Sequence, residues 1–377
     1  MTDAVVTSCR PADGGSSAVP TVAGLGPHAL YACPRWLEVL ERGGRGPAEY
    51  VDGASPGQPP LGLLPVHLDA PTSSSRYAPA QLLRGLPAAL VEQPWSFAGP
   101  VSAYHTDVPT VVAAPRASSA AALLRQAQRT ASAEGRPLLV PYLTDAVAQV
   151  LPADLAGARL LQAFDCWHES EASSPEEYVA TLPRKRRQAL NRRVRDFVRA
   201  GLAAGVEPLR EHVDVFARLV TNTSAKYGLA SRPQAMAEHL RHIAAVYGDD
   251  AVLFVATDDR GEIVGAVLGL LHADELYLRM TGFDYAATDG SSTYFVLAYH
   301  QPLAYRRERP HRRVHHGTGL LYTKLLHGAR PRPLWALLLG ARTEGVDFAE
   351  INRLRAAELL EGLPAEMVDL AGGTLPT

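Results

Sequence analysis

The sequence predicts an α/β protein built from two units. Its 377 residues are about twice the usual length of one domain, and 47% of them are hydrophobic, which is enough to form buried cores. Residues 251–257, 262–272 and 275–282 are apolar segments joined by short turns, the pattern of an antiparallel meander. Helical and strand-like segments alternate before and after this meander. These observations exclude a disordered chain and a fibrous repeat.

The first half alternates short helices and strands with long loops. Residues 1–26 are rich in Ala, Gly, Ser and Pro and predict a mobile tail. Residues 69–104 are dense in Pro and Gly and predict loops with short strands. The remaining elements expected here are helices at 31–40 and 118–134 and strands at 48–51, 61–67 and 137–142.

Helices are expected on the N-terminal side of the meander. Ser174 as N-cap, Pro175 at the first helical position and Glu177 three residues after the cap predict a helix start. A second helix is expected from residue 184 to Gly201, with one apolar stripe and otherwise cationic faces. Two amphipathic helices are expected at 208–227 and 233–247.

After the meander the pattern predicts a helix over 292–305, a short strand at 312–317, a helix beginning near Gly319 and a strand at 334–339. The order of elements from 208 to 339 is therefore ααβββαβαβ.

Positive charge is concentrated in two segments. The net charge is only −2, and 34 of the 37 basic residues are Arg, with Lys at positions 185, 226 and 324 alone. Outside residues 184–199 and 306–313, the chain has 24 basic and 37 acidic residues, so these two basic clusters belong to an otherwise acidic chain. Such clusters are typical of contact with a phosphate backbone, and a solvated helix face is the alternative. The basic residues are Arg184, Lys185, Arg186, Arg187, Arg192, Arg193, Arg195 and Arg199, and Arg306, Arg307, Arg309, Arg312 and Arg313.

The order of elements resembles the GNAT acyltransferase fold, and within it the FemAB-like, peptidoglycan-biosynthesis-like branch. The resemblance covers about residues 170–340. It depends on the order and spacing of three motifs: Tyr178-x3-Leu182-Pro183-Arg184-Lys185-x-Arg187, Gly282-Phe283-Asp284, and Gly317-x-Gly319-x4-Lys324-x3-Gly328.

The resemblance implies two GNAT-like units with mixed, largely antiparallel sheets flanked by helices and joined by a basic helical segment. We therefore expect a tail at 1–26, a diverged first unit at 27–170, a basic connector at 171–204 and a second GNAT-like domain at 205–377.

It also implies an aminoacyltransferase that uses aminoacyl-tRNA as co-substrate and no resident cofactor, with a small-molecule or peptide acceptor in natural-product or cell-wall-related biosynthesis. Two alternatives remain open: an N-acyltransferase that uses acyl-CoA, and a non-catalytic RNA-binding module. A CoA-dependent GNAT typically has Arg or Gln at the position of Val314, which weakens the first alternative.

Four residues are candidates for the chemistry. Lys324, after the Gly-rich loop, is expected to stabilise charge on a carbonyl or ribose oxygen, with a surface lysine as the alternative. Asp284 is expected to orient an acceptor amine or accept its proton, unless it only forms a turn. His315 and His316 alternate faces on a short strand, so only one can face a cleft and act as base; a structural role is the alternative.

Further residues are expected to bind substrate. Tyr277 and Arg279, two apart on a strand, are expected to share one face and line the cleft with Tyr294, unless they only pack. Gly317 and Gly319 are expected to present backbone N–H groups to an anion at a helix start.

Several classes of chemistry and location are not expected. Cys9, Cys33 and Cys166 form no CxxC pair, so we expect neither a disulfide framework nor a metal site, and no thiol nucleophile. No apolar run is long enough to span a bilayer, and the first residues lack a basic segment followed by an apolar one. We expect a soluble, cytoplasmic protein.

Overall fold

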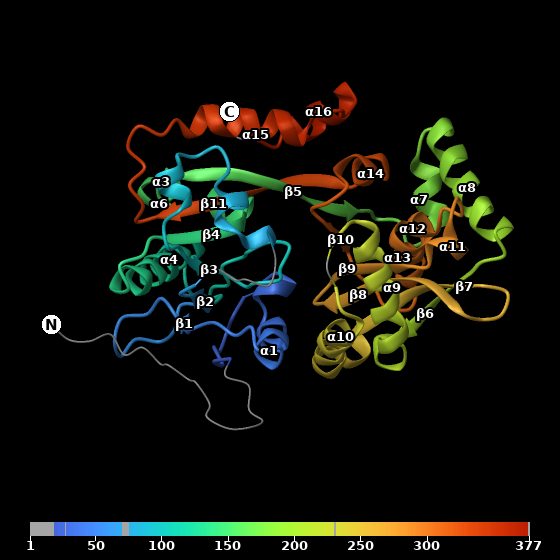
Figure 1. Cartoon of the computed structure of the whole chain (residues 1–377), viewed down its shortest axis with the longest axis horizontal. Coiled ribbons are helices and arrows are strands. Elements are labelled where there is room, and N and C mark those ends of the chain that lie inside the picture. The colour runs from blue at the N-terminus through green and yellow to red at the C-terminus, as the bar shows by residue number, and fades with distance from the viewer. Residues whose placement is uncertain (1–18, 27, 70–74, 230, 376–377) are drawn as a thin grey trace. The chain divides into compact units, whose positions relative to one another are not determined.

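The computed structural model describes residues 19–26, 28–69, 75–229 and 231–375, which fall into two compact units (Figure 1). Unit 1 contains the described residues up to Asp165 and those from Pro331 onward, and unit 2 contains Cys166–Arg330. Most of the expected tail, residues 1–18, lies outside the described residues.

These boundaries differ from the expected ones. Strand β11 (Arg330–Leu339) pairs antiparallel with β4 (Leu138–Thr144), and this pairing between distant segments places the C-terminal part of the chain in unit 1. Helix α8 (Arg184–Arg199) lies inside unit 2. The basic helix is therefore part of a unit, not a connector between two units.

The sheet of unit 1 has the order β1–β2–β3–β4–β11–β5. Strands β3 and β4 pair in parallel, whereas β1–β2, β2–β3 and β4–β11 are antiparallel. The new bounds are β1 (Glu49–Val51), β2 (Leu64–His67), β3 (Ser96–Ala98) and β5 (Arg159–Glu169), of which β5 enters unit 2 at Cys166.

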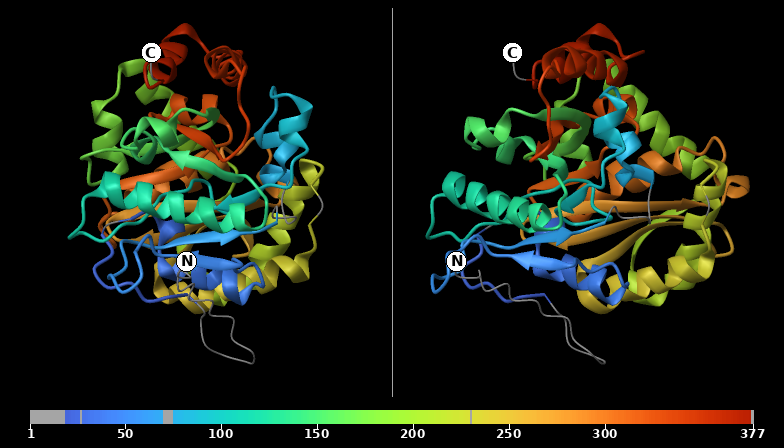
Figure 2. Two further views of the ribbon diagram at one scale, coloured as in Figure 1. Left: turned by 90° about the vertical axis from the view of Figure 1, so that its left-hand side faces the viewer. Right: turned by 60° about the vertical axis from the view of Figure 1, so that its left-hand side comes forward.

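Helices cover both faces of this sheet. Helix α4 (Arg116–Ala133) lies along one face (Figure 2), where Leu124 and Ala127 pack with Val140. On the other face, Leu82 and Leu90 pack with Phe97 in a second core. The remaining helices of unit 1 are α1 (Pro34–Arg42), α2 (Pro79–Leu82), α3 (Ala88–Val91), α5 (Asp145–Ala148), α6 (Ala153–Ala156), α15 (Phe348–Leu359) and α16 (Ala365–Gly372).

The sheet of unit 2 has the order β5–β10–β9–β8–β7–β6. The expected meander is confirmed as three antiparallel strands, and β9 pairs in parallel with β10. Strand β6 ends at Pro208 and a 3-10 helix covers Leu209–Glu211, so the helix expected from 208 starts only at Val213. The bounds are β6 (Ala203–Pro208), β7 (Ala251–Thr257), β8 (Ile263–His272), β9 (Glu275–Phe283) and β10 (Arg313–Gly317).

Two helical layers enclose the sheet of unit 2. Helices α9 (Val213–Lys226) and α10 (Pro233–Tyr247) pack together, and α9 approaches β9 so closely that a Cβ on Gly282 would lie 2.5 Å from the Val220 nitrogen. Leu190 of α8 and Val296 pack on Phe254. The other helices are α7 (Pro175–Thr181), α11 (Tyr285–Thr288), α12 (Thr293–Phe295), the π-helix η5 (Val296–His300), α13 (Gln301–Tyr305) and α14 (Leu321–Leu326).

The expected α/β fold of two units, with mixed sheets flanked by helices, is thus confirmed. Ser174 caps α7 as expected, since its hydroxyl accepts a hydrogen bond from the Glu177 nitrogen at 3.2 Å. In the described part of the chain, no helix is long and apolar enough to cross a membrane.

Candidate functional site

The parallel strands β9 and β10 of unit 2 separate after a short pairing. They pair from Arg313↔Glu275 to His315↔Tyr277, and β10 ends at Gly317, whose φ of +70° few other residues adopt. Strand β9 continues to Phe283, and its residues at 279–281 are only partly buried. An open strand edge of this kind offers backbone N–H and C=O groups to an extended, amide-containing ligand.

A bulge in β9 lies at the same place. On β8, Gly269 pairs with Leu278 and Leu268 pairs with Met280, so Arg279 is an extra residue on β9. The strict period of two, from which we expected Tyr277 and Arg279 to share a face, is therefore interrupted. Bulges are common beside active sites, where they redirect a side chain.

His315 lies in a row of aromatic side chains across three strands. Its ring centroid is 4.7 Å from that of Trp167 and 5.0 Å from that of Tyr277, and its side chain is fully buried. The Tyr277 hydroxyl donates to Glu275 at 2.5 Å, and the Arg313 guanidinium donates to the same carboxylate at 2.6 Å.

His316 lies on the opposite face of β10, as the strand period requires. Its ring stacks on Tyr299 with centroids 4.5 Å apart and lies 6.4 Å from the ring of His168. Burial holds the pKa of His316 well below its ordinary value, and the charges of His168 and Lys324 lower it further. His316 is therefore a neutral imidazole near pH 7, able to accept a hydrogen bond or hold a proton in transit.

Lys324 is buried beside this imidazole. Only 3% of its surface is exposed, which excludes the surface-lysine alternative. It lies on α14, which begins at Leu321 after a left-handed Leu320. No atom lies within 4 Å of the place where a Cβ on Gly319 would stand, so the loop between β10 and α14 has free space at that point.

The π-helix and its neighbours supply residues that the sequence analysis did not select. The side chains of His168, Tyr178, Phe295, Tyr299 and His327 line a small apolar pocket. The Tyr178 hydroxyl donates to the His327 carbonyl at 3.0 Å. Tyr178 belongs to a motif quoted above, whereas the other positions carry no local signal because they meet only through tertiary packing.

Two further expected residues take structural positions. Asp284 is the N-cap of α11 and accepts a hydrogen bond from the Ala286 nitrogen at 3.0 Å. This agrees with the turn alternative and leaves its role in proton transfer a prediction. Tyr294 is partly buried, with its ring 6.3 Å from that of Phe283 and 6.1 Å from that of Tyr299.

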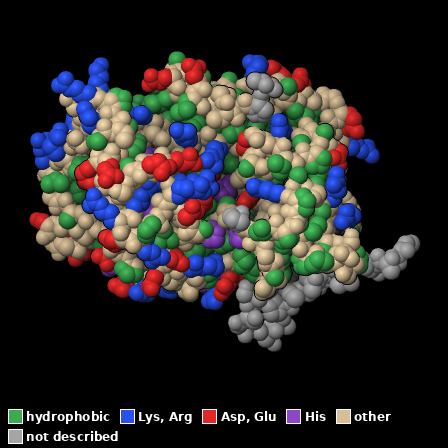
Figure 3. Space-filling view, turned by 180° about the vertical axis from the view of Figure 1, so that it is seen from behind, with side chains coloured by type: hydrophobic (Ala, Val, Ile, Leu, Met, Phe, Trp, Pro, Cys, Tyr) green, Lys and Arg blue, Asp and Glu red, His purple; other side chains and the backbone are tan. Residues whose placement is uncertain are grey.

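The basic residues of α8 divide between two faces. Arg186 and Arg193 face the interior of unit 2 and hydrogen-bond with Leu325, Leu326 and His327. In Figure 3, Lys and Arg side chains project at the upper left, where α8 lies. The exposed cationic side chains are those of Arg184, Lys185, Arg187, Arg192, Arg195 and Arg199.

The second basic cluster is largely neutralised within unit 2. Arg306 is buried and donates to the carbonyls of Ser170, Ala172 and Arg312. The other four are paired with carboxylates, as Arg307–Glu176, Arg309–Asp250, Arg312–Asp274 and Arg313–Glu275. RNA binding by this cluster stays a prediction. On α8, Arg192 and Arg199 share the carboxylate of Asp196 at 3.5 and 3.7 Å, and the other exposed cations of that helix keep it strongly positive.

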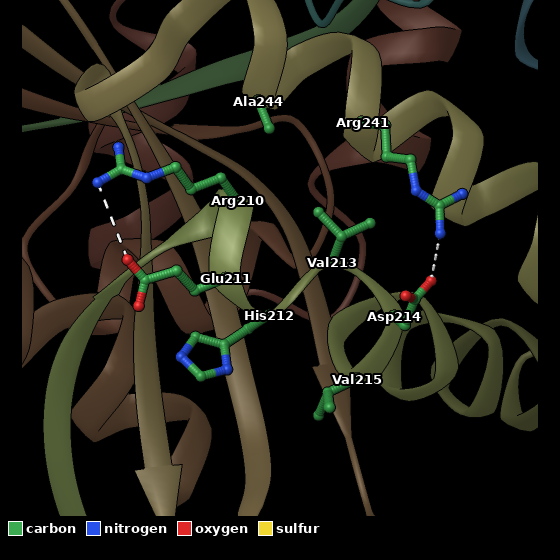
Figure 4. Close-up of a pocket in the computed structure, with 8 residues that line it drawn as sticks. All are labelled: Arg210, Glu211, His212, Val213, Asp214, Val215, Arg241 and Ala244. Carbon is green, nitrogen blue, oxygen red and sulfur yellow. Dashed lines mark hydrogen bonds and ion pairs between the residues drawn. The ribbon is translucent and has the colours of Figure 1, made fainter.

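A second hollow of unit 2, of about 370 Å³, lies where α9 begins (Figure 4). Arg241 donates to Asp214 at its rim at 2.7 Å. Nearby, Glu207, Glu211 and His212 place one ligand atom each within 4.8 Å of one another, a set that can coordinate a divalent cation. All three side chains reach solvent, at 28–56% exposure, which is usual for surface residues without an ion.

Unit 1 has a buried pair of its own. The His105 Nδ1 lies 3.1 Å from an Asp165 carboxylate oxygen, and both side chains are almost fully buried. The sequence analysis selected neither residue, because 59 positions separate them and no motif connects them.

Comparison with solved structures gives distant matches that share the fold. FemX superposes with a TM-score of 0.53 at 12% identity, over 86% of this chain and 94% of its own. A protein of unknown function from Bacteroides thetaiotaomicron gives 0.52 at 13% identity, over 82% and 91%. L-PGS from Bacillus licheniformis gives 0.51 at 12% identity, over 86% and 97%. A search of curated proteins finds no match.

The model of the FemAB-like family, described as peptidoglycan biosynthesis/recognition, matches residues 102–343. This range includes all of unit 2 and is well over half of the chain. Together with the fold, it supports an acyltransferase. The chain belongs to the FemAB-like family.

Proposed function

We propose that the protein is an aminoacyltransferase that moves an aminoacyl group from aminoacyl-tRNA to an amine or hydroxyl of a small-molecule or peptide acceptor, in natural-product or cell-wall-related biosynthesis. The observation that carries this proposal is the exposed cationic face of α8, in the same unit as the open edge of β9 and the buried Lys324. A row of six exposed cations fits a phosphate backbone better than a small acyl donor.

The reaction requires little from the protein. An aminoacyl ester is already activated, so an acceptor held about 3 to 3.5 Å from its carbonyl carbon gains most of its rate from position. The acceptor nitrogen or oxygen attacks the carbonyl, loses its proton, and the ribose oxygen leaves with a proton. In this scheme the β9 edge aligns the aminoacyl group through its backbone.

Lys324 then stabilises the negative charge that develops on the carbonyl oxygen or the leaving ribose oxygen. Neutral His316, whose pKa the Lys324 charge helps to lower, relays the proton between acceptor and leaving group. Asp284 orients an acceptor amine at the end of β9, in addition to capping α11.

The alternative donor, acyl-CoA, has weaker support. Val314 occupies the position where CoA-dependent relatives have a basic or amide side chain, and it is buried within β10. The remaining alternative, a binding module without activity, does not account for a buried lysine beside a buried imidazole.

One assay separates these possibilities. Purified protein is incubated with tRNA charged with labelled amino acids, and a panel of amine- and hydroxyl-bearing acceptors that includes peptidoglycan precursors. We expect label to move from tRNA to an acid-soluble product, and RNase pretreatment to abolish the transfer. Transfer from labelled acetyl-CoA that RNase leaves unchanged would overturn the tRNA donor. Binding of tRNA with no transfer to any acceptor would favour the non-catalytic module.

A further inference from the structure

Helix α8 carries positive charge on two faces that meet different surroundings. At 100° per residue, its six exposed cations fall within an arc of about 160°. Arg186 and Arg193 lie outside this arc, on the side of the buried Leu190 and Phe197. The two inner arginines therefore serve a purpose other than contact with a partner in solution.

Arg186 binds the end of the helix that carries Lys324. Its Nη2 donates to the Leu325 carbonyl at 2.9 Å and to the Leu326 carbonyl at 2.6 Å, and its Nε donates to Leu326 at 3.1 Å. These carbonyls belong to the last turn of α14, where carbonyls lack the usual partners within the helix; that of Leu325 also accepts from the Gly328 nitrogen at 3.0 Å. The planar guanidinium presents its N–H groups in a fixed fork that reaches both carbonyls, whereas a lysine ammonium has no fixed fork and would lose more side-chain freedom for each hydrogen bond.

Arg193 binds the residue that follows this helix. Its Nη1 lies 2.8 Å from His327 Nε2, and its guanidinium lies 5.4 Å from the centre of the Phe295 ring. His327 is itself 3% exposed, and its ring lies 4.4 Å from that of Tyr299 in the π-helix. Burial and the two neighbouring arginines lower the pKa of His327 to about 3, so its imidazole stays neutral and accepts from Arg193.

We propose that Arg186 and Arg193 are positioning residues that fix α14, and with it Lys324, to the helix whose outer face binds the donor RNA. This inference rests on the proposed function for the identity of the partner. In a chain with so many exposed arginines, these two are set apart by their contacts: every hydrogen bond described for their side chains goes to a residue between Leu325 and His327. Donor contact with the outer face of α8 is in this way linked to the position of a buried lysine.

The kinetic test compares inner and outer arginines of the same helix. We expect Arg186→Lys and Arg193→Lys to lower kcat about 10- to 100-fold while the KM for charged tRNA changes less than threefold. The matched outer variants Arg192→Gln and Arg195→Gln should raise KM and leave kcat within twofold. If the inner variants instead raise only KM, they are phosphate contacts and the proposal is wrong.

A second test needs no turnover and uses the scarcity of lysine. The protein is treated with an amine-acetylating reagent, and mass spectrometry measures the acetylation of Lys324 relative to that of the exposed Lys185 and Lys226. In the wild type, Lys324 should be protected. In Arg186→Gln its labelling should rise at least fivefold relative to the other two, whereas the surface control Arg260→Gln should match the wild type. Unchanged protection of Lys324 in both Arg186→Gln and Arg193→Gln would overturn the proposal.

Bulk uncharged tRNA added to the same experiment tests the link itself. It should change the labelling of Lys324 in the wild type, and the change should disappear in Arg186→Gln although that variant still binds tRNA. A change that persists in Arg186→Gln would mean direct shielding by RNA and no link through α8. If the lysine responds as expected but no aminoacyl transfer is found, the proposed function fails and the positioning role stands.

Discussion

Units 1 and 2 contain the same central motif, a parallel strand pair connected by helices. The two units differ in whether the chain covers the strand edge beyond the paired residues. In unit 1, β3 pairs with β4 through Ser96 and Phe97 and ends at Ala98. The chain then returns, and Thr106 forms backbone hydrogen bonds with Tyr142 at 2.8 Å and Thr144 at 2.9 Å, beside β4. In unit 2, β9 continues past its three paired residues while β10 turns away.

Side chains complete the closure in unit 1. The Arg76 guanidinium lies 3.9 Å from the centre of the Tyr142 ring, and the Tyr77 hydroxyl donates to the Ala103 carbonyl at 2.9 Å. Protein atoms thus occupy the place that unit 2 leaves open. The comparison shows that a parallel strand pair can have either of two roles. Where the chain covers the open strand edge itself, as in unit 1, the pair is structural; where the edge stays open, as in unit 2, it can bind a ligand.

The largest effect is expected from the buried lysine of unit 2. Lys324→Met should lower kcat about 10²- to 10³-fold with little change in the KM for the donor, because stabilisation of transition-state charge is lost. Steady-state kinetics with charged tRNA measure this. Lys226→Met in unit 2 and Tyr142→Phe in unit 1 are the controls and should stay within twofold of the wild type. Normal kinetics in a folded Lys324→Met protein would remove the lysine from the site.

The next effect concerns the charged face of α8. Replacing Arg187, Arg192, Arg195 and Arg199 by Gln should weaken tRNA binding at least tenfold at moderate salt and reduce the slope of log affinity against log salt by about 3. Binding titrations at several salt concentrations measure both. The matched unit 1 variant, with Arg42, Arg116, Arg125 and Arg129 replaced by Gln, should keep the wild-type slope. Equal slopes in all three proteins would contradict the assignment.

Acid should destabilise unit 2 more than unit 1. Burial lowers the pKa of His168 to about 4 and that of His327 to about 3, from an ordinary value of 6.5, whereas in the described part of unit 1 a comparable shift is found at His67. At a pH between the folded-state pKa and 6.5, the unfolded chain binds more protons than the folded chain. The free energy of unfolding therefore falls as the pH drops below 6.5. Each such histidine costs about 2 kcal/mol at pH 5.

Hydrogen exchange at pH 7 and pH 5, corrected for intrinsic rates, measures this difference. Amides of unit 2 should lose protection first, and His327→Gln should make the loss smaller. Earlier loss of protection in unit 1 would reverse the comparison.

The smallest effect is expected from two buried thiols in the described part of the chain, Cys33 of unit 1 and Cys166 of unit 2. Cys33→Ala and Cys166→Ala should leave kcat within twofold and lower the free energy of unfolding by about 1 kcal/mol, because neither sulfur is expected to act as nucleophile. Chelator added to the transfer step, with tRNA charged beforehand, should likewise have no effect. Loss of turnover in a folded Cys166→Ala protein would show that thiol chemistry takes part.

Local patterns in the sequence predicted most elements, and long-range pairing explains the failures. The capped helix at Pro175, the helix ending at Tyr247 and the three-strand meander follow from periodicity and turn residues. Strand β11 was expected as a strand, but its partner β4 is almost 200 residues away, and nothing local assigns it to unit 1.

The candidate site was predictable to a lesser degree. Lys324 and the glycine loop are visible as a motif, whereas the bulge at Arg279 depends on register with β8 and has no sequence signature. The inward direction of Arg186 and Arg193 could be read only in part from the apolar stripe of α8. The carboxylate partners of the second basic cluster come from distant segments, so charge counting along the chain overestimated its positive field.

The insertion of unit 2 between two segments of unit 1 also orders events during synthesis. On the ribosome, residues 166–330 emerge before β11, so the sheet of unit 1 lacks the strand between β4 and β5 until all of unit 2 has been made. The usual sequence, in which the N-terminal domain of a nascent chain is completed first, is reversed. Unit 2, which carries the candidate site, can fold while the sheet of unit 1 is still incomplete. During this time the edges of β4 and β5 that later pair with β11 are exposed, and a chaperone could bind them.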